Sequence, residues 1–346
     1  MFDKNKLTDI LERLRQEHKI AGMAVAVTDR EKVIYTEGFG FDSAIRPDVR
    51  AYPDGMYKIA SVTKTVVAIM VMRLAEQGIL DLDKPIINYI PSLTLSNPES
   101  TQKMTLWHLL THTSGMPGDA YMEEGSRDEA TIDEVVKAKV STFENLSPCG
   151  ERFMYSTWGY NLIGTVASAV TGKPISELLD EYVLTPLDMQ TTTFDYHIAS
   201  TYPLSLPHEK VKEGGFRVIH HQRVNTAYSA GGGLYSNVSD MCSMLRLFIN
   251  KGHTASGEQL LTEESLSKMI AKYHRRPNRP QCFYGAAIMQ EEYDGGWICG
   301  HTGNYDPYNC SVFADTEKGY GIAFLANTDI SDVRYEIPKL ILNMLP

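Results

Sequence analysis

The sequence predicts an α+β fold, in which an antiparallel sheet built from the N- and C-terminal segments is flanked by helices and carries a mostly helical insert. Two observations predict it: strand-like runs joined by turns occupy both ends of the chain, and helical patterns fill the middle. Strands and helices that are segregated along a chain are typical of this class. We expect one unit over residues 1–346, with an α/β part at about 1–58 and 225–346 and a helical part at about 59–224.

The N-terminal segment predicts a helix and a hairpin. Apolar residues repeat at helical spacing between positions 4 and 18, which predicts an amphipathic helix. Two strand-like runs, 24–28 and 33–36, flank a polar turn at 29–32, which is the pattern of a β-hairpin. This hairpin is the N-terminal contribution to the expected sheet.

A long apolar run follows Ser61 and predicts a buried helix. Residues 65–74 contain no proline, and Gly78 stands where a glycine commonly ends a helix. Lys64 stands three residues after Ser61, on the same helix face, so its ammonium group can approach the serine hydroxyl. The start of a helix also presents unpaired N–H groups and a positive dipole end, which favour anionic intermediates beside Ser61.

The Ser-x-x-Lys spacing is not specific by itself. Residues 265–268 repeat it in a polar segment that no long apolar helix follows. Ser61 could equally be a helix cap, with Lys64 in a solvated first turn. A serine hydroxyl is a weak nucleophile at neutral pH and needs an activating neighbour, so the rest of the chain must decide.

The middle and the end of the chain predict the remaining elements. Helical patterns occur at 131–140, at 161–170 and, after a glycine-rich passage at 231–233, at about 238–250. The C-terminal strand-like runs lie at 284–290, 297–303, 310–314 and 321–325, and the turns between them at 293–296 and 316–319. A last apolar pattern at 337–344 predicts a closing helix.

Composition and charge exclude several classes of function. The 346 residues carry a net charge of −10 without any block of lysine or arginine, so we expect neither nucleic acid nor an anionic membrane as a partner. No apolar run reaches the roughly 18 residues of a membrane span. The start of the chain lacks an apolar signal core, so we expect a cytoplasmic protein if this terminus is native, and a periplasmic or extracellular one if a leader was removed. Nothing in the sequence sets an oligomeric state.

Disulfide and metal chemistry is not expected. The five cysteines are scattered and lack C-x-x-C spacing, which predicts free thiols. Four histidines between 195 and 225 follow no metal-binding template. We therefore expect no metal and no cofactor.

Three motifs occur in order: Ser61-x-x-Lys64, an aromatic hydroxyl at Tyr155, and His-Thr-Gly at 301–303 on a predicted strand. This set resembles the penicillin-recognising serine hydrolases, which include class C β-lactamases, D-amino-acid peptidases and related esterases and carry Ser-x-x-Lys, Tyr-x-Asn and Lys/His-Thr-Gly. Further blocks at 109–117, 155–164 and 230–234 resemble the class C branch. The resemblance covers about residues 5–345 and implies a β-lactamase/transpeptidase-like fold.

The tyrosine motif has two candidates. Residues 235–237 are a literal Tyr-x-Asn, whereas Tyr155 is followed two positions later by Thr157. We choose Tyr155 because it lies 91 residues after Lys64 and 146 before His301 and precedes Gly-Tyr-x-Leu-x-Gly at 159–164. Tyr235 belongs to the glycine-rich block, which the resemblance implies is structural. The alternative is that Tyr155 is an ordinary packed tyrosine.

The resemblance implies a mechanism. Ser61 attacks an acyl carbonyl and becomes acylated, and Tyr155 protonates the leaving group and later activates water. Lys64 either stabilises the Tyr155 phenolate or is itself the neutral base, and the sequence leaves both open. The backbone N–H groups of Ser61 and Asn304 are the implied oxyanion hole.

Two departures from the family pattern bear on the substrate. Thr157 stands where the family has an asparagine that donates to the substrate, and a threonine has one hydroxyl donor where asparagine has two N–H donors. His301 replaces the lysine of true β-lactamases and is mostly neutral at pH 7, so it anchors a β-lactam carboxylate less well. Thr302 and Gly303 complete the expected substrate-binding set. The alternative for His301 is a polar strand residue that faces water.

These features predict a serine hydrolase that cleaves small esters or amides, of the esterase or D-residue peptidase type. One alternative is a β-lactamase or D-alanyl-D-alanine carboxypeptidase. An alternative of another class is a penicillin-binding sensor with little turnover, which Thr157 suggests. We expect the loops at 118–145 and 195–225 to line the cleft and choose the substrate.

Overall fold

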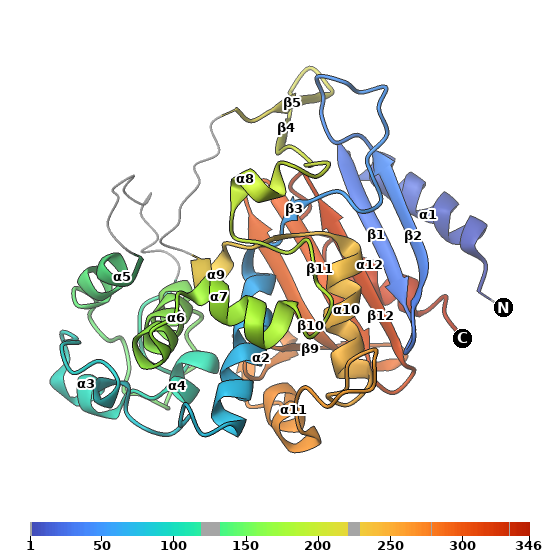
Figure 1. The fold of residues 1–346 in the computed structure, drawn as a ribbon. Helices are drawn as coiled ribbons and strands as arrows, with labels where there is room; N and C mark the ends of the chain where they lie inside the picture. Colours follow the sequence, from blue (N-terminus) through green and yellow to red (C-terminus); the bar gives the residue numbers. More distant parts are fainter. Residues whose placement is uncertain (1, 119–131, 221–228, 278, 332) are drawn as a thin grey trace.

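The computed structural model describes residues 2–118, 132–220, 229–277, 279–331 and 333–346. Within them lies an eight-stranded sheet of order β2-β1-β12-β11-β10-β9-β8-β7, whose neighbouring strands are antiparallel (Figure 1). Its strands are β1 (Gly22–Thr28), β2 (Val33–Gly40), β7 (His274–Arg276), β8 (Arg279–Tyr284), β9 (Met289–Tyr293), β10 (Gly296–Tyr305), β11 (Tyr308–Asp315) and β12 (Tyr320–Ala326). The α+β prediction is confirmed.

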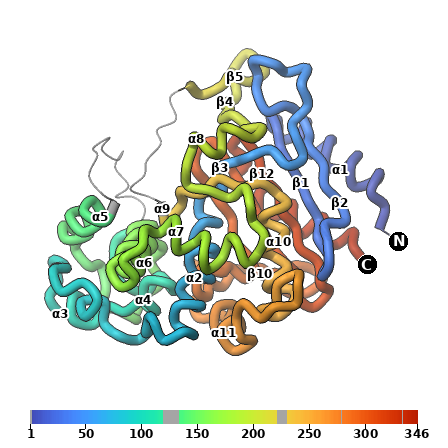
Figure 2. The backbone as a smooth tube through the Cα atoms, viewed as in Figure 1, coloured from blue at the N-terminus to red at the C-terminus, as the bar shows by residue number. Residues whose placement is uncertain are grey.

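The sheet joins the two ends of the chain. β1 lies between β2 and β12, so the N-terminal hairpin is hydrogen-bonded to the last strand. The helices nearest the termini, α1 (Lys4–Glu17) and α12 (Glu336–Leu342), belong to one apolar cluster. Both termini lie on the same side of the molecule (Figure 2). The predicted construction of the sheet from N- and C-terminal segments is therefore confirmed.

Both faces of the sheet are buried, as β1 illustrates. Its odd-numbered residues, from Met23 to Val27, belong to the cluster that contains α1 and α12, whereas Ala24 and Ala26 belong to the cluster on the other face. There α10 (Val238–Ile249) packs across β1 and β12. Side chains alternate along a strand, so a strand that is apolar at every position fits a sheet covered on both faces.

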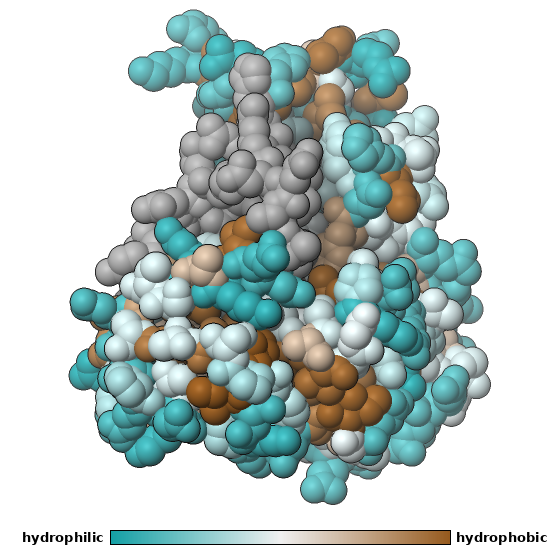
Figure 3. All heavy atoms as spheres, turned by 60° about the vertical axis from the view of Figure 1, so that its left-hand side comes forward, coloured by the Kyte–Doolittle hydropathy of each residue, from teal (hydrophilic) through white to brown (hydrophobic). Residues whose placement is uncertain are grey.

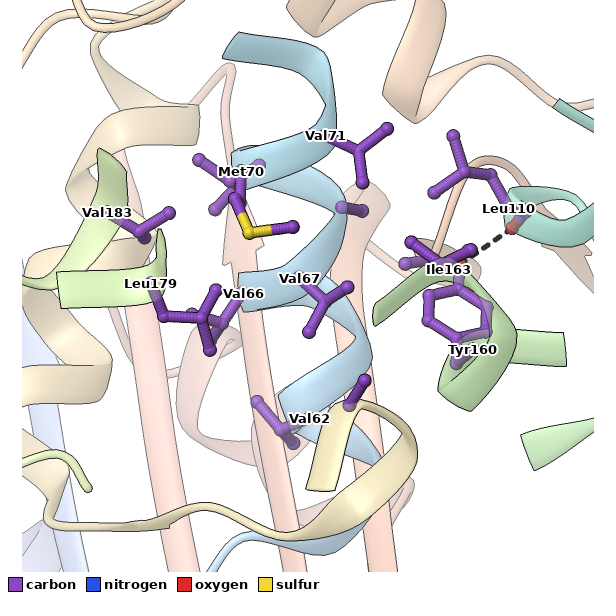
Figure 4. Close-up of a cluster of buried hydrophobic side chains, with 14 of the residues drawn as sticks. Val62, Val66, Val67, Met70, Val71, Leu110, Tyr160, Ile163, Leu179 and Val183 are labelled. Atoms are coloured by element: carbon purple, nitrogen blue, oxygen red, sulfur yellow. Dashed lines mark hydrogen bonds between the residues drawn. The ribbon is translucent and has the colours of Figure 1, made fainter. Parts of the chain in front are cut away.

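The central helix of the second face is α2 (Thr63–Glu76), and the turn before it, η1 (Ala60–Val62), carries Ser61. Figure 4 shows apolar side chains of this segment packed between two groups of neighbours. Leu110, Tyr160 and Ile163 lie on one side of the segment, and Leu179 and Val183 lie on the other. The side chains of the segment itself are those of Val62, Val66, Val67, Met70 and Val71. The predicted buried helix is confirmed. Gly78 follows its end with a φ of 71°, a left-handed conformation that favours glycine.

The remaining helices lie beside α2 and α10, mostly on the left of Figure 1. They are η2 (Ile86–Asn88), α3 (Pro98–Lys103), α4 (Leu106–Leu110), α5 (Ile132–Val140), α6 (Thr157–Thr171), α7 (Ile175–Leu179), η4 (Asp180–Leu184), α8 (Tyr196–Ala199), α9 (Ser229–Gly232) and α11 (Glu263–Ile270). Seen from this side, hydrophobic surface forms separate patches divided by hydrophilic residues (Figure 3). The division of the chain into an α/β part and a helical part stays a prediction.

Two small ribbons complete the fold, and one of them bears on the site. β3 (Tyr57–Lys58) pairs with β6 (Tyr235–Ser236), while β4 (His208–Lys210) pairs with β5 (Phe216–Val218). The first pairing brings the glycine-rich passage beside the segment that leads into Ser61.

Element boundaries differ from the predictions at several places, and two of these differences have a clear local cause. The predicted single strand at 284–290 is wrong: β8 ends at Tyr284, and β9 begins at Met289. A turn separates them, in which Gly285 N–H donates to the Ile288 carbonyl at 2.7 Å and Ala287 has a φ of 59°. Helix α6 begins four residues before the predicted start because Ser156 caps it.

The described part of the chain contains no helix that is long and apolar enough to cross a membrane. The five cysteines are free thiols, as predicted.

Candidate active site

The local geometry of η1 and α2 brings Ser61 and Lys64 together, as their spacing predicts. Lys64 Nζ lies 3.2 Å from Ser61 Oγ, and Lys64 is completely buried. Ala60, just before the serine, has a φ of 47°, which is uncommon for residues other than glycine. Backbone conformations of this kind cluster at active sites.

The Lys64 ammonium group donates to acceptors on η1, α6 and α9. Its acceptors are Ser61 Oγ at 3.2 Å, Thr157 Oγ1 at 3.2 Å and the Gly231 carbonyl oxygen at 2.5 Å. A protonated lysine has three N–H donors, whereas a neutral amine has two. A protonated Lys64 can satisfy these acceptors together, and the choice between Lys64 and Tyr155 as the base stays a prediction.

Helix α6 and the glycine passage hold these acceptors in place. Ser156 Oγ accepts from Gly159 N–H, which caps α6 and makes Thr157 its first residue. Gly231 N–H donates to Asn161 Oδ1 at 2.9 Å. A β-carbon at Gly231 would lie 2.5 Å from Thr157 Cγ2, so only glycine allows α9 to approach α6 this closely.

Tyr155 lies beside Lys64, in the segment just before α6. Lys64 Nζ is 5.0 Å from the centre of the Tyr155 ring and 5.7 Å from that of Tyr160, within the range of cation–π attraction. Tyr160 is fully buried, and its hydroxyl donates to the Leu110 carbonyl at 2.7 Å. Tyr155 is only half-buried. It is therefore the phenol that combines a nearby cation with access from solvent.

His301 lies against Tyr155, with 6.3 Å between the ring centres, but it is only 1% exposed. Its Nε2 is 2.8 Å from Tyr284 Oη, and its Nδ1 is 2.5 Å from the Thr302 carbonyl oxygen. Burial, together with the nearby Lys64 charge, lowers the pKa of His301 to about 3, so the ring is neutral at pH 7. The alternative of a strand residue that faces water is wrong.

The rest of the His-Thr-Gly motif continues β10. Thr302 is buried and Asn304 is exposed. A β-carbon at Gly303 would lie 2.3 Å from the Ile59 carbonyl oxygen, so the missing side chain lets β10 pass close to the turn that carries Ser61. The proposed oxyanion hole of Ser61 and Asn304, and substrate contacts of Thr302 and Gly303, stay predictions.

The second Tyr-x-Asn and Ser-x-x-Lys matches of the sequence lie away from Lys64 on other elements. Tyr235 is buried in β6, and Asn237 is the cap of α10. Ser265 and Lys268 lie on α11, where Lys268 Nζ is 4.5 Å from the centre of the Trp107 ring. Neither match lies on η1 or in the segment just before α6, which carry Ser61 and Tyr155.

A cavity of about 360 Å³ opens beside Tyr155. It is lined by Phe153, Tyr155, Arg276, Pro277, Arg279 and Tyr335. Arg279 is neutralised by the buried Glu291, at 2.7 Å. Arg276 donates to Tyr335 Oη at 3.2 Å and pairs with no carboxylate of the described residues. Burial raises the pKa of Tyr335, but the charges of Arg276 and Arg334, together with hydrogen bonds to Thr302 and Arg276, lower it below the usual value of a phenol. The cavity therefore presents a positive charge to an entering group.

The predicted cleft-lining loops are described only in part. Residues 119–131 and 221–228 lie outside the described residues. Tyr196, from the second loop, lines a different cavity of about 680 Å³ between α7 and α8, to which none of the predicted site residues contributes. The role of the loops in substrate choice stays a prediction.

Three residues near the site were missed by the sequence analysis: His112, Tyr284 and Arg276. His112 stands in the block at 109–117, and that block was the only available signal for it. Tyr284 and Arg276 belong to no motif. They reach the site because the sheet places β8 and β7 on the β9 side of β10.

The assembled groups suit nucleophilic chemistry. A serine hydroxyl contacts a buried ammonium group, and a half-buried phenol faces that same ammonium group. Among the residues that the structure describes, no group of three or more histidine, cysteine, aspartate or glutamate side chains could hold a metal ion.

Comparison with known proteins identifies relatives along nearly the whole chain. The family model described as Beta-lactamase matches residues 7–342. Protein flp of Staphylococcus aureus strain MW2 is 23% identical over 352 residues, which cover 98% of this chain and 65% of that protein. The chain thus spans just under two thirds of the length of this relative.

Solved structures share the fold. The octameric penicillin-binding protein homologue from Pyrococcus abyssi has a TM-score of 0.83 and 26% identity, covering 99% of this chain and 78% of its own. The D-amino acid amidase from Ochrobactrum anthropi SV3, complexed with L-phenylalanine amide, has a TM-score of 0.82 and 21% identity, covering 98% of each chain. The predicted β-lactamase/transpeptidase-like fold is confirmed.

Proposed function

The chain belongs to the β-lactamase family, and we propose that it is a serine hydrolase that cleaves small esters or amides through an acyl-enzyme on Ser61. The observation that carries this proposal is the 3.2 Å contact of Ser61 Oγ with the buried Lys64 ammonium group, which also faces the Tyr155 ring. These side chains supply the nucleophile, the cation and the acid–base group that acyl transfer requires.

In the proposed reaction the Tyr155 phenolate takes the proton of the Ser61 hydroxyl as Oγ attacks the acyl carbonyl. Lys64 stays protonated and stabilises the phenolate and then the tetrahedral anion. The backbone N–H groups of Ser61 and Asn304 bind the oxyanion. Tyr155 next gives its proton to the departing alkoxide or amine. It then deprotonates a water molecule that attacks the Ser61 ester, and it returns this proton to Ser61 Oγ as the acid is released.

His301 supports esters and amides over β-lactams as substrates. Both of its ring nitrogens are hydrogen-bonded within the protein, and its pKa of about 3 leaves it uncharged. It therefore offers no positive charge to a β-lactam carboxylate.

The cavity beside Tyr155 favours a narrower second candidate: amides whose leaving group ends in a free carboxylate, as in a D-residue carboxypeptidase. Tyr155 protonates the leaving group in the proposed reaction, so the cavity that Tyr155 lines is the place for that group. Arg276 supplies the unmatched positive charge there, and a guanidinium binds carboxylates well. The D-amino acid amidase from Ochrobactrum anthropi shares the fold.

The first experiment measures hydrolysis of p-nitrophenyl butyrate by the wild type, Ser61→Ala and Ser265→Ala. We expect Ser61→Ala to lose about a thousandfold or more in kcat, because a missing nucleophile abolishes the acyl-enzyme. Ser265→Ala is the matched control, since it alters the second Ser-x-x-Lys on α11. Retention of most activity in Ser61→Ala would rule out Ser61 as the nucleophile.

The same proteins distinguish the alternatives. Rapid turnover of nitrocefin identifies a β-lactamase, and release of D-alanine from a D-alanyl-D-alanine peptide identifies a carboxypeptidase. A stable penicilloyl adduct on the wild type, absent from Ser61→Ala and without turnover of any ester or amide, identifies a sensor.

Arg276→Gln tests the narrower candidate. For a small D-residue amide with a free terminal carboxylate we expect KM to rise about ten- to a hundredfold, since a charge-assisted hydrogen bond is lost. The same compound with an amidated terminus is the control and should show no change. Equal effects on both compounds would contradict a carboxylate site at Arg276.

A further inference from the structure

We propose that His112 and Tyr284 are positioning residues for Tyr155, joined with His301 in one uncharged chain of hydrogen bonds behind its ring. The inference rests on the proposed role of Tyr155 and adds to it the device that holds this phenol in place. It also accounts for the Thr-His-Thr-Ser-Gly block at 111–115, which the proposed reaction does not use.

His112 holds the backbone on both sides of Tyr155. Its carbonyl oxygen accepts from Met154 N–H at 2.7 Å, and its Nδ1 accepts from Ser156 N–H at 3.1 Å. Its ring lies against the Tyr155 ring, with 4.3 Å between their centres. The two flanking peptide groups and one ring face of Tyr155 therefore all depend on a single residue.

The backbone of His112 is itself unusual. Its φ of 57° lies in the left-handed region, which residues other than glycine adopt infrequently. This conformation directs the carbonyl oxygen and the ring of His112 toward the same stretch of chain. Backbone strain that the surrounding structure maintains is typical of functional sites.

The direction of the hydrogen-bond chain is set at both ends. The Ser156 N–H can only donate, so His112 Nδ1 carries no proton and its Nε2–H faces Tyr284 Oη at 3.2 Å. The Thr302 carbonyl can only accept, so His301 Nδ1 carries a proton and its Nε2 is the acceptor for Tyr284 Oη–H at 2.8 Å. The two imidazoles therefore hold opposite tautomers, and Tyr284 accepts from one and donates to the other.

Burial and nearby positive charges keep this series of hydrogen-bonded side chains uncharged. The charged or titratable groups that face the two imidazoles are Lys64 of α2, Arg276 of β7, Arg334 between β12 and α12, and the phenols of Tyr155, Tyr160 and Tyr284. Burial, reinforced by the Lys64 charge, holds the pKa of His112 well below its usual range. A proton on either imidazole would place a second cation against Lys64. On His112 it would break the hydrogen bond from Ser156 N–H, and on His301 it would reverse the hydrogen bond with Tyr284.

The tautomers can be measured in the wild type. A two-bond ¹H–¹⁵N correlation spectrum, assigned with His112→Gln and His301→Gln, reports which ring nitrogen carries the proton. We expect His112 as the Nε2–H form and His301 as the Nδ1–H form, both neutral from pH 8 down to about 5. The same tautomer on both rings, or a cation on either above pH 5, would overturn the proposal.

Tyr284→Phe tests the effect on catalysis, with Tyr293→Phe as the matched control. Tyr293 is a second buried tyrosine, whose hydroxyl donates to Asp315 near the opposite end of β10. We expect Tyr284→Phe to lower kcat about tenfold while KM stays within about twofold, because positioning of Tyr155 is weakened. Tyr293→Phe should change neither.

The outcomes separate this proposal from the proposed function. A kcat within twofold of the wild type in Tyr284→Phe overturns the positioning role, even when Ser61→Ala is inactive. Full activity of Ser61→Ala overturns the proposed function, whereas the tautomer measurement does not depend on activity. If Tyr284→Phe does not fold, the wild-type tautomers still decide.

Discussion

The structure gives Thr157 a contact that the sequence did not predict. The sequence places it where relatives have an asparagine that contacts substrate. In the structure its Oγ1 accepts a hydrogen bond from the Lys64 ammonium group at 3.2 Å. A hydrogen bond to a charged donor contributes about 1.5–3 kcal/mol. Thr157 therefore supports Lys64 directly, whatever it contributes to substrate binding.

Thr157→Val should lower kcat/KM about ten- to a hundredfold, which corresponds to the loss of that hydrogen bond. Thr165→Val is the matched control, because Thr165 lies on the same helix, is equally buried, and its Oγ1 has no partner among the described residues. We expect this control to keep full activity and stability. Steady-state kinetics and thermal melts of both variants provide the comparison, and similar losses in the two would argue against the Lys64 contact.

At the scale of elements, the site depends on the close approach of η1 to β10. Gly303 makes this approach possible, since a β-carbon added at this position would lie 2.3 Å from both the Ile59 carbonyl oxygen and Cys310 Sγ. Cys310 Sγ already donates to that carbonyl at 3.1 Å. The close approach of Gly303 to Ile59 joins η1, the turn before α2, to β10, the strand that carries His301. Without this approach, nothing would fix the position of Ser61 relative to the His-Thr-Gly motif of β10.

Gly303→Ala should therefore displace η1 from β10. We expect a loss of about 1–3 kcal/mol in the free energy of unfolding from overpacking, and a fall of about a hundredfold in kcat from misplacement of Ser61. Gly159→Ala is the control: a β-carbon there would meet Leu109 at an ordinary 3.5 Å, and alanine favours helices. Denaturant unfolding and ester hydrolysis measure both effects. A fully active Gly303→Ala would show that the approach is not needed.

At the scale of the whole molecule, buried neutral histidines make stability depend on pH. Burial lowers the pKa of His301 to about 3 and that of His208, which lies far along the chain from the site motifs, to about 4. The unfolded chain binds these protons near pH 6.5. Between pH 6.5 and these lower values the unfolded state holds more protons, so the free energy of unfolding falls as the pH falls, by up to about 1.4 kcal/mol per pH unit for each residue.

His208→Gln should reduce by one the number of extra protons that the unfolded state takes up, and so weaken the dependence of the free energy of unfolding on pH. Urea unfolding between pH 6.5 and 4.5 is expected to give a shallower slope than the wild type, by up to about 1.4 kcal/mol per pH unit. His253→Gln, which changes an exposed histidine, is the control. Identical slopes for His208→Gln and the wild type would mean that His208 takes up its proton equally in both states.

Elements with a strong local pattern were predictable. The apolar run of α2, the hairpin of β1 and β2, and Gly78 after the end of α2 were all recognised, because helical and strand periodicity and helix caps depend on residues a few positions apart. The strand boundary at Tyr284 was missed, since the apolar pattern continues through a turn that only its hydrogen bonding and backbone conformation reveal.

The order of motifs along the chain was enough to name the family and to propose Ser61, Lys64 and Tyr155 as site residues. The contact of Ser61 with Lys64 was also predictable, because a helix places residues three apart on one face whatever surrounds it. Contacts between distant segments depend instead on strand order and helix packing. These tertiary contacts buried His301, joined Thr157 to Lys64, placed Ser265 and Tyr235 elsewhere, and assembled His112 and Tyr284 around Tyr155. Such residues lie far apart in the chain, so no local pattern records that they meet.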